Sequence, residues 1–293
     1  MGDEDVLASR FEELRPRLRT LAYRMLGSPS EAEDAIQETW LRLARSDAQE
    51  IENLDGWLTT VLGRVCLNVL RSRRARREEP LPDYAVPELI VTRPSETDPE
   101  HEALLADAVG VALLVILDTL SPAERVAFVL RDMFAIPFEE IAGMLERSPE
   151  ATRQLASRAR RRVRGSAPTP DADRRRQREV VDAFFAAARG GDLERLVTLL
   201  DPQIVLRADF GPKRKPLRLE GPERVIKAAR AGAAAGYELV PVLVNGIAGA
   251  LSLENGRPFS LMAFTVVDGR IVAVDVLADR ERLAALDVEA LRS

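Results

Sequence analysis

Hydrophobic side chains recur at helical spacing along the first part of this 293-residue chain. In segment 8–26 they fall three or four residues apart, on one face of a helix, at Phe11, Leu14, Leu18, Leu21, Ala22 and Met25. The same spacing returns in segment 54–77, at Trp57, Leu58, Val61, Leu62, Val65 and Val69. Between the two, Ser30 and Glu33 have the spacing of a capping box, which predicts a helix start. We therefore predict a helical domain over residues 1–79.

Prolines interrupt the helical pattern after residue 79. They recur through segment 80–100, at Pro80, Pro82, Pro87, Pro94 and Pro99, and exclude a continuous helix there. This linker is acidic, yet it contains the apolar run YAVPELIV. Because an exposed apolar patch usually marks a contact surface, we expect Val86, Leu89 and Ile90 to dock on another part of the chain.

Residues 101–165 return to the helical pattern. Within them, Ser121, Pro122 and Glu124 predict a capped helix start, with proline at the first helical position. Residues 166–174 then form a short polar tether. This stretch therefore predicts a second helical domain that ends before the tether.

The pattern changes again in residues 175–293. The stretch REVVDAFFAAARGGDLERLVTLL predicts a helical hairpin broken at Gly190-Gly191. Strand-like apolar runs follow, with hairpin-turn signals at Asn255-Gly256 and Asp268-Gly269. Helices followed by antiparallel strands indicate an α+β domain, and this domain is the partner that we expect for the apolar linker residues.

Composition narrows the class of protein. Hydrophobic residues make up 46% and charged residues 30%, a profile typical of globular proteins. Cys66 is the one cysteine and lies in an apolar helical run, so we expect a buried, inert thiol and no disulfide. His101 is the one histidine, so we expect no metal and no cofactor. The acidic N-terminus is unlike a signal peptide, and no apolar run could span a bilayer, so we expect a cytoplasmic protein.

The overall net charge of −5 hides a strongly basic segment. Residues 148–164 predict a helix capped by Ser148, with an apolar stripe at Ala151, Leu155, Ala159 and Val163. The opposite face is rich in arginine. Just upstream, FEEIAGML predicts a short helix that buries Phe138, Ile141, Ala142 and Leu145. Two short helices, a tight turn and a basic outer face indicate a DNA-binding helix-turn-helix; a solvated charged helix is the alternative, which the glycine-free turn at Glu146-Arg147 favours slightly.

The ordered segments together resemble the extracytoplasmic-function class of bacterial sigma factors. EAEDAIQETWLRLAR is similar to the helix that binds the polymerase clamp, and LDGWLTTVLGRVCLNVLRSRRARR to the segment that melts and reads the minus-ten element. LSPAERVAFVLRDMFAIPFEEIAGMLERSPEATRQLASRARRRVR is similar to the domain that reads the minus-thirty-five element. AFFAAARGGDLERLVTLLDPQIVLRADF resembles the start of the SnoaL-like domain that one subgroup carries at its C-terminus.

This resemblance implies the fold and the partners. The N-terminal two-thirds would be mainly α, with sigma domain 2 over 1–79 and sigma domain 4 over 101–165. A cone-shaped α+β SnoaL-like barrel would follow over 175–293. The implied partners are core RNA polymerase, through the β′ clamp and β, and promoter DNA, with no membrane. The implied activity is promoter-specific initiation without enzymatic turnover, controlled in cis by the C-terminal domain.

Three sets of residues are expected to carry this function. The clamp-binding face would comprise Asp34, Gln37 and Glu38. At the minus-ten element, phosphates would be held by Arg64, Arg71, Arg73 and Arg74, and a base by Asn68. At the minus-thirty-five element, the residues nearest the bases would be Arg153, Gln154, Ser157 and Arg158, with Arg160, Arg161 and Arg164 on phosphates. We expect Trp40 and Trp57 to pack in the core.

Three stretches differ from what the subgroup usually carries. YAVPEL stands where a WLPEP linker motif is usual, and DFGPKRKP stands where DGGG usually follows the first strand of the C-terminal domain. LADRERL stands near the end in place of an Asn-Pro-Asp stretch. These differences bear on the contact between the linker and the C-terminal domain.

Two other classes of function remain open. A one-component regulator could use the same helix-turn-helix with an effector pocket in the C-terminal domain, but it would not need residues 30–79 to bind polymerase. A SnoaL-like isomerase or cyclase would need an acid or base in an apolar cavity, and the candidates on strands are Asp209, Asp275 and Tyr237. We prefer a regulatory domain whose pocket a small ligand could occupy.

Overall fold

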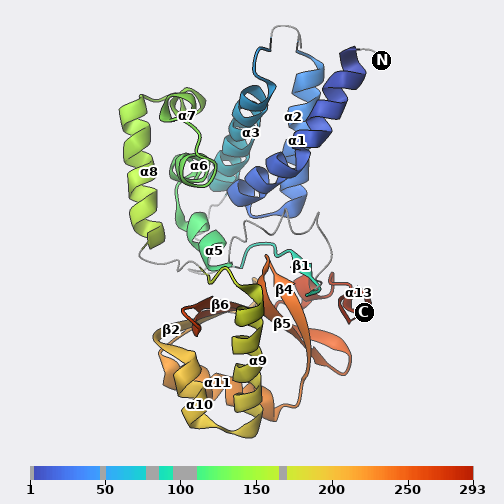
Figure 1. Ribbon diagram of the computed structural model, residues 1–293, viewed down its shortest axis with the longest axis vertical. Coiled ribbons are helices and arrows are strands. Elements are labelled where there is room, and N and C mark those ends of the chain that lie inside the picture. The colour runs from blue at the N-terminus through green and yellow to red at the C-terminus, as the bar shows by residue number, and fades with distance from the viewer. Residues whose placement is uncertain (1–2, 47–50, 77–85, 95–110, 165–169, 293) are drawn as a thin grey trace. The chain divides into compact units, whose positions relative to one another are not determined.

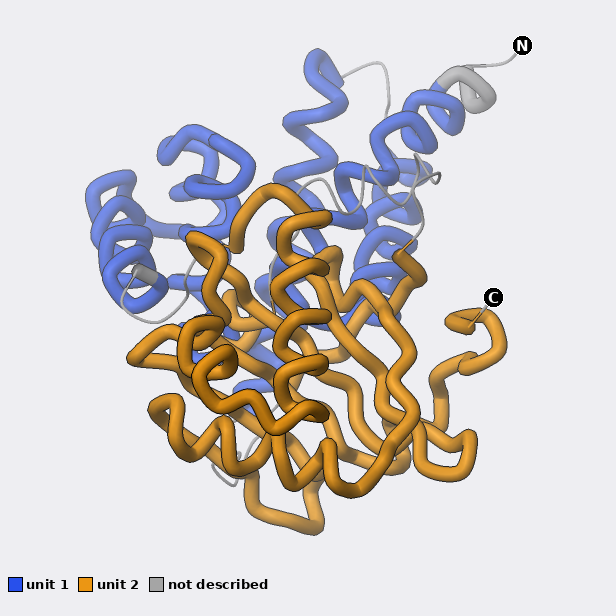
Figure 2. Tube along the Cα trace, turned by 60° about the horizontal axis from the view of Figure 1, so that its bottom comes forward, with its two compact units in different colours: residues 1–79, 100–104, 116–166 blue, residues 80–99, 105–115, 167–293 orange. Residues whose placement is uncertain are grey.

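The computed structural model describes residues 3–46, 51–76, 86–94, 111–164 and 170–292. The chain divides into two compact units (Figure 2). The first comprises residues 1–79, 100–104 and 116–166, and the second comprises residues 80–99, 105–115 and 167–293. The linker residues 86–94 thus belong to the same unit as the C-terminal domain.

Three long helices begin the first unit: α1 (Asp3–Leu26), α2 (Pro29–Ala44) and α3 (Leu54–Arg76). They pack their predicted apolar faces together, and fully buried side chains include Leu18, Leu21, Met25, Ile36, Leu58 and Leu62. The start of α2 differs from the prediction: the cap is Ser28, whose hydroxyl accepts from the Glu31 amide at 3.3 Å, with Pro29 as the first helical residue. Proline needs no partner for its nitrogen at that position, so the helix begins before Ser30.

Helix α5 (Val111–Thr119) begins in the second unit and ends in the first, and the shorter helices α6 (Pro122–Phe128), α7 (Phe138–Leu145) and α8 (Pro149–Arg164) complete the first unit. The capping box at the start of α6 is confirmed, since the Ser121 hydroxyl accepts from the Glu124 amide and the Glu124 carboxylate accepts from the Ser121 amide. After α6 the chain widens into a π-helical turn, η2 (Val129–Met133), within the stretch predicted as one regular helix.

The C-terminal domain is an α+β fold, as predicted. Its helices are α9 (Arg174–Gly190), α10 (Leu193–Leu199), α11 (Pro222–Ala234), α12 (Arg280–Leu283) and α13 (Val288–Arg292). Its strands are β2 (Leu200–Asp209), β3 (Leu217–Glu220), β4 (Glu238–Val244), β5 (Ile247–Glu254), β6 (Arg257–Val267) and β7 (Arg270–Leu277). With β1 (Val91–Thr92) from the linker they form one sheet, in the order β1-β4-β5-β6-β7-β2-β3. Only the β2–β7 pair is parallel among the described strands.

Turn chemistry fixes the register of this sheet. Gly191 ends α9 in the left-handed region at φ 72°, which confirms the predicted break in the helical hairpin. Asn255-Gly256 and Asp268-Gly269 take positive φ at both residues, as hairpin turns of this kind require. Asn245-Gly246 makes a third such turn that sequence reasoning missed; β3 and α11 were missed as well.

The sheet has an apolar cluster on each side. One is shared with α9, α10 and α11, which cover the sheet in Figure 1, and contains Val181, Phe184, Leu196 and Phe264. The other contains residues of β4, β5 and β6 together with Val86, Val111 and Val115, which precede the C-terminal domain in the chain. Residues from the linker and from the start of α5 therefore complete the core of the C-terminal domain.

Candidate polymerase and promoter interface

The short helix α7 and the basic helix α8 form the predicted helix-turn-helix. Ser148 caps α8, its hydroxyl accepting from the Ala151 amide at 3.2 Å. The glycine-free turn forms because Glu146 itself adopts the left-handed conformation, at φ 56°. The buried stripe of α8 differs from the prediction: Thr152, Leu155, Ala156 and Ala159 are buried, whereas Ala151 and Val163 are only partly so. Phe138, predicted to be buried, is partly exposed and lies under the guanidinium groups of Arg131 and Arg153.

The outward face of α8 carries most of the predicted minus-thirty-five residues. Arg153, Gln154, Ser157, Arg158 and Arg161 lie at i, i+1, i+4, i+5 and i+8 and so share one side of the helix, and all but the half-buried Ser157 are exposed. Arg153 pairs with Glu139 at 2.8 Å, and Arg158 lies 3.5 Å from Glu124. The side chain of Arg164 lies outside the described residues.

Arg160 lies at the edge of this face. Its Nε and Nη2 donate to the two carboxylate oxygens of Asp132, at 2.7 and 3.1 Å. This hydrogen bonding raises the pKa of Arg160 above its ordinary value. A phosphate would have to compete with a bidentate carboxylate here, whereas the Arg161 side chain is exposed.

Helix α3 presents Arg64, Asn68, Arg71 and Arg74 as exposed side chains. Arg73, expected on the same surface, points elsewhere. It forms an ion pair with Glu31 and donates to the Leu26 carbonyl at 2.7 Å, so it ties α3 to the end of α1 and the start of α2. These bonds indicate a structural role for Arg73, and its contact with phosphate stays a prediction.

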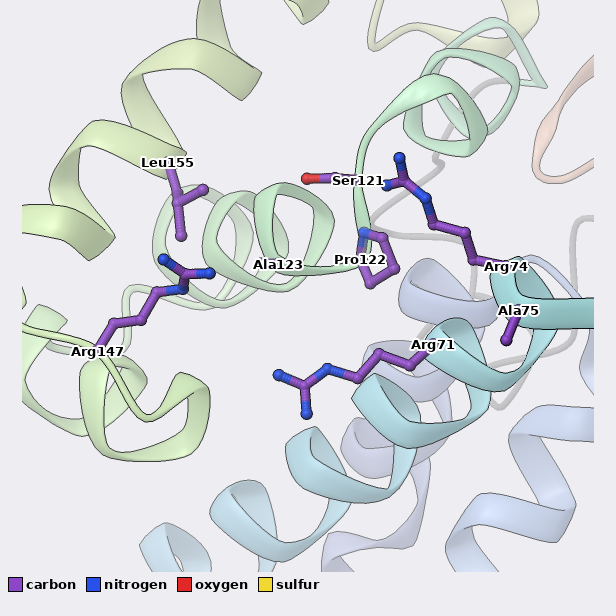
Figure 3. Close-up of a pocket in the computed structure, with 8 residues that line it drawn as sticks. All are labelled: Arg71, Arg74, Ala75, Ser121, Pro122, Ala123, Arg147 and Leu155. Atoms are coloured by element: carbon purple, nitrogen blue, oxygen red, sulfur yellow. The ribbon is translucent and has the colours of Figure 1, made fainter.

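Part of the α3 surface faces the helix-turn-helix module. Arg64 donates to the Gly143 carbonyl of α7 at 3.3 Å, and a Cβ at Gly63 would lie 3.0 Å from the Met144 sulfur. A pocket of about 460 Å³ lies between α3 and the start of α6. Figure 3 shows the Arg74 side chain directed toward Ser121 and the Arg71 side chain extended toward Arg147, which enters from the α7–α8 turn. Sequence reasoning missed Arg147.

Helix α2 presents the predicted clamp-binding residues. Asp34 and Gln37 are exposed and Glu38 is half-buried, with an ion pair to Arg42 at 2.9 Å. Leu41 follows on the same face and is 42% exposed, an unusual position for a large apolar side chain. Trp40 packs against the buried Phe11 with ring centroids 4.9 Å apart but is only partly buried, so it lies at the edge of the core in which it was expected. Leu41 was missed because sequence periodicity alone assigns leucine to the core.

The linker is held by the C-terminal domain through backbone bonds. The Val86 amide donates to Asp209 Oδ2 at 2.9 Å, and Arg282 donates to the carbonyls of Val86 and Pro87 at 2.8 and 2.6 Å. Ile90 exchanges two bonds with Asn245, both at 2.8 Å. Val86 is 3% exposed, and Leu89 packs against the same apolar cluster.

These bonds join the three stretches that differ from the subgroup pattern. Val86-Pro87 lies in YAVPEL, Asp209 begins DFGPKRKP, and Arg282 lies in LADRERL. The Arg282 guanidinium also lies 3.3 Å from the Asp209 carboxylate. These two paired side chains bind the backbone of the linker. The three stretches that differ from the subgroup pattern thus contact one another.

The carboxylates considered for catalysis have structural partners. Asp209 holds the linker, and Asp275 forms a buried ion pair with Arg207 at 2.8 Å. Tyr237 stacks on Phe259 with ring centroids 4.3 Å apart. Of the three, only Tyr237 lines the domain's cavity. Among the described residues there is no cluster of His, Cys, Asp and Glu that could hold a metal ion, and no helix is long and apolar enough to cross a membrane.

Comparison with known proteins defines the class first. Residues 10–76 match the family model of sigma-70 region 2, and residues 110–163 match that of sigma-70 region 4. Sigma factors of this class bind core RNA polymerase and promoter DNA and are not enzymes.

Whole-chain relatives narrow the family. The chain is 35% identical to the ECF RNA polymerase sigma factor SigJ of Mycobacterium tuberculosis, over 97% of this chain and 96% of SigJ. It is 33% identical to the probable ECF sigma factor SigI of the same organism, over 99% of each. The crystal structure of SigJ superimposes with a TM-score of 0.73 at 33% identity and covers 96% of this chain and 99% of SigJ. The chain therefore belongs to the extracytoplasmic-function RNA polymerase sigma factors, and is a SigJ- and SigI-like member with a C-terminal SnoaL-like domain of the NTF2-like fold.

Proposed function

We propose that this sigma factor reads its promoters through α3 and α8 and that its C-terminal domain controls this reading in cis. On α8, Arg153, Gln154, Ser157 and Arg158 contact bases of the minus-thirty-five element while Arg161 holds phosphate. The observation that carries this assignment is the shared outward face of these residues. The first residues of a recognition helix enter the major groove, and later ones lie along its edge.

At the minus-ten element, Arg64, Arg71 and Arg74 contact phosphates and Asn68 contacts a base. Their exposure on α3 supports this role. Core polymerase is bound through the β′ clamp, and β, by the α2 face of Asp34, Gln37 and Glu38, with Leu41 as an apolar anchor. The factor thus works in the cytoplasm, where the polymerase is.

We expect control in cis to act on the side of α3 that lies against α6 and α7. Arg64 donates to the Gly143 carbonyl of α7, and Arg71 and Arg74 line a pocket beside the start of α6, so we expect these exposed arginines to engage DNA fully only after α3 separates from that module. The docking of Val86, Leu89 and Ile90 on the C-terminal domain fixes part of the linker between the two DNA-reading modules. A fixed linker limits how far the modules can move apart. The docked linker therefore favours the state in which α3 stays in contact with α6 and α7.

One experiment tests the initiation role. Core RNA polymerase is incubated with this chain and a library of promoter DNA, and transcripts are mapped. We expect specific start sites that core enzyme alone does not use. Promoter binding by the chain without binding to core enzyme would instead indicate a one-component regulator. Absence of both would contradict the assignment of α2, α3 and α8.

A further inference from the structure

The C-terminal domain encloses a cavity of about 510 Å³ between its sheet and helices α9 and α11. Apolar side chains make most of the wall, among them Phe184, Phe185, Leu206, Phe259, Met262 and Phe264. Small-molecule sites are typically apolar cavities of about 300–1,000 Å³ with a few polar groups. This cavity has the size and lining for the hydrocarbon or aromatic body of a small ligand.

The charged side chains among the described residues of the cavity wall are all positive. Arg189, Arg214 and Arg280 line the cavity and are exposed, whereas no aspartate or glutamate is among the described lining residues. The Arg214 guanidinium lies 4.1 Å from the ring centroid of Phe210, which places it over the apolar wall. The lining serines bond to each other, Ser252 Oγ and Ser260 Oγ being 2.7 Å apart. The arginines are thus the groups available to a charged ligand, and they favour an anion.

The end of β2 connects this cavity to the docked linker. Ala208 and Phe210 line the cavity, and Asp209 between them turns to the other side and accepts from the Val86 amide. Neighbouring residues of one strand thus contact the cavity and the linker.

The segment that follows β7 also contacts both the cavity and the linker. Ala278, directly after the strand, and Arg280 of α12 line the cavity, and Arg282 of α12 holds the Val86 carbonyl. The Ala278 amide also donates to the Asp209 carbonyl at 2.7 Å, which joins the two strand ends. A ligand that orders these ends also orders both groups that hold the linker.

We propose that the cavity binds an anionic amphiphile, namely a carboxylate with a hydrocarbon or aromatic body, and, resting on the cis control proposed above, that its binding tightens the hold on the linker. The apolar body fills the cavity, and the carboxylate is held at the opening by Arg214 and Arg280. Binding that rigidifies the end of β2 and α12 raises the affinity for the docked linker without a change of fold.

Binding is tested on the full-length protein without polymerase. The fluorescent fatty acid cis-parinaric acid serves as probe, displaced by dodecanoate, dodecan-1-ol or dodecylamine below their micelle concentrations. We expect dodecanoate to displace it at a concentration about tenfold lower than the alcohol, and the amine to be weakest. The double variant Arg214→Gln/Arg280→Gln should remove the advantage of the carboxylate, whereas Arg224→Gln, on the exposed side of α11, should keep it.

A second variant guards against misfolding. Ala229→Trp fills the cavity from α11. This variant should bind neither cis-parinaric acid nor dodecanoate nor the alcohol, and its circular dichroism spectrum should be unchanged. Equal affinity for the three amphiphiles, or binding that survives Ala229→Trp, would overturn the assignment of the cavity to an anionic amphiphile.

Tightening of the linker is measured separately, by amide hydrogen exchange at Val86 and Ile90. Dodecanoate should slow exchange at both amides by about threefold or more, and not in Ala229→Trp. Binding with unchanged exchange would contradict the link between cavity and linker. Neither measurement involves promoter DNA, so failure of the proposed cis control would appear only in transcription and is distinguishable from failure here.

Discussion

At the scale of single residues, charge pairing separates arginines that look equivalent in sequence. Arg73 is held by Glu31 and the Leu26 carbonyl, and Arg160 by both oxygens of Asp132. Arg161 is exposed on the outward face of α8, and Arg153 is held by exposed carboxylates that a base could replace. Arginine therefore has a buried or bidentate intramolecular partner at two of these positions and stays exposed at the other two.

Arg153→Ala should relax base preference at one position of the minus-thirty-five element, at a cost of about 1–3 kcal/mol in binding to the preferred sequence. Arg161→Ala should weaken binding to all sequences alike and reduce the dependence on salt by about one counterion. Fluorescence anisotropy with a panel of single-base variants at several salt concentrations measures both. Losses at the two positions that do not depend on sequence would contradict the division between base and phosphate contacts.

Arg73→Ala should lower the free energy of unfolding by about 1–3 kcal/mol, because it leaves the Glu31 carboxylate and the Leu26 carbonyl without their donor. Urea denaturation measures this loss, with the exposed Arg74→Ala as the matched control. A fully stable Arg73→Ala chain with weakened DNA affinity would restore the phosphate-binding role.

Cys66 should be unreactive in the folded protein. It is buried, and burial raises the pKa of its thiol to about 12, so the nucleophilic thiolate is absent at pH 8. Iodoacetamide should label it only after unfolding, as mass spectrometry would show. Because the unfolded thiol loses its proton near pH 9 while the folded thiol does not, its contribution to stability should fall as pH rises above about 9. Rapid labelling at pH 8 would contradict the buried position.

At the scale of elements, α2 shows how one amphipathic helix divides its faces. Ala32, Ala35, Ile36 and Leu43 are buried, whereas Asp34, Gln37, Glu38 and Leu41 form the opposite surface. Glu33, between them, is engaged with Arg15 and Arg19 of α1 at 3.1 and 3.0 Å. The face left for a partner is therefore smaller than the number of acidic residues in the helix suggests.

The double variant Asp34→Lys/Glu38→Lys should reduce affinity for core polymerase by about tenfold or more, because two interface charges change sign. The fold should be unaffected, since neither residue is buried. Pull-down or interferometry with core enzyme measures this, with Glu13→Lys on the exposed side of α1 as the matched control. Equal affinity of all three chains would place the polymerase contact elsewhere.

At the scale of the whole molecule, the chain order differs from the division into compact units. Residues that precede the helix-turn-helix module belong to the unit formed by the C-terminal domain, and Val86, Val111 and Val115 complete one of that domain's two apolar clusters. The C-terminal domain therefore contacts the linker directly, through Asp209, Asn245 and Arg282.

Replacing Val86, Leu89 and Ile90 by serine should release the linker and raise promoter binding by the full-length chain by about fivefold, at the low end of typical coupling between sites. The matched control is Arg93→Ser, an exposed residue of the same segment. Transcription and DNA affinity are measured for both. If the triple variant and the control behave alike, the linker does not connect the C-terminal domain to promoter binding.

The sequence alone determined the class of protein and most of the elements. Helical periodicity, the Ser121–Glu124 capping box and the Gly190-Gly191 break depend on residues near one another in the chain, so local chemistry predicts them. The order of the motifs indicated a sigma factor with a SnoaL-like domain. Capping signals did not identify the start of α2, because Ser28 and Ser30 lie two residues apart and either could cap the helix.

Tertiary structure decided which polar groups are used and which remain available. Arg73, Arg160 and Asp209 are bound by Glu31, Asp132 and the Val86 amide, and each of these partners lies far from it in the chain. The same holds for Leu41, whose exposure depends on which side of α2 faces α1 and α3. Burial and ion pairing depend on distances in space, and helical spacing fixes only the side of the helix on which a residue lies.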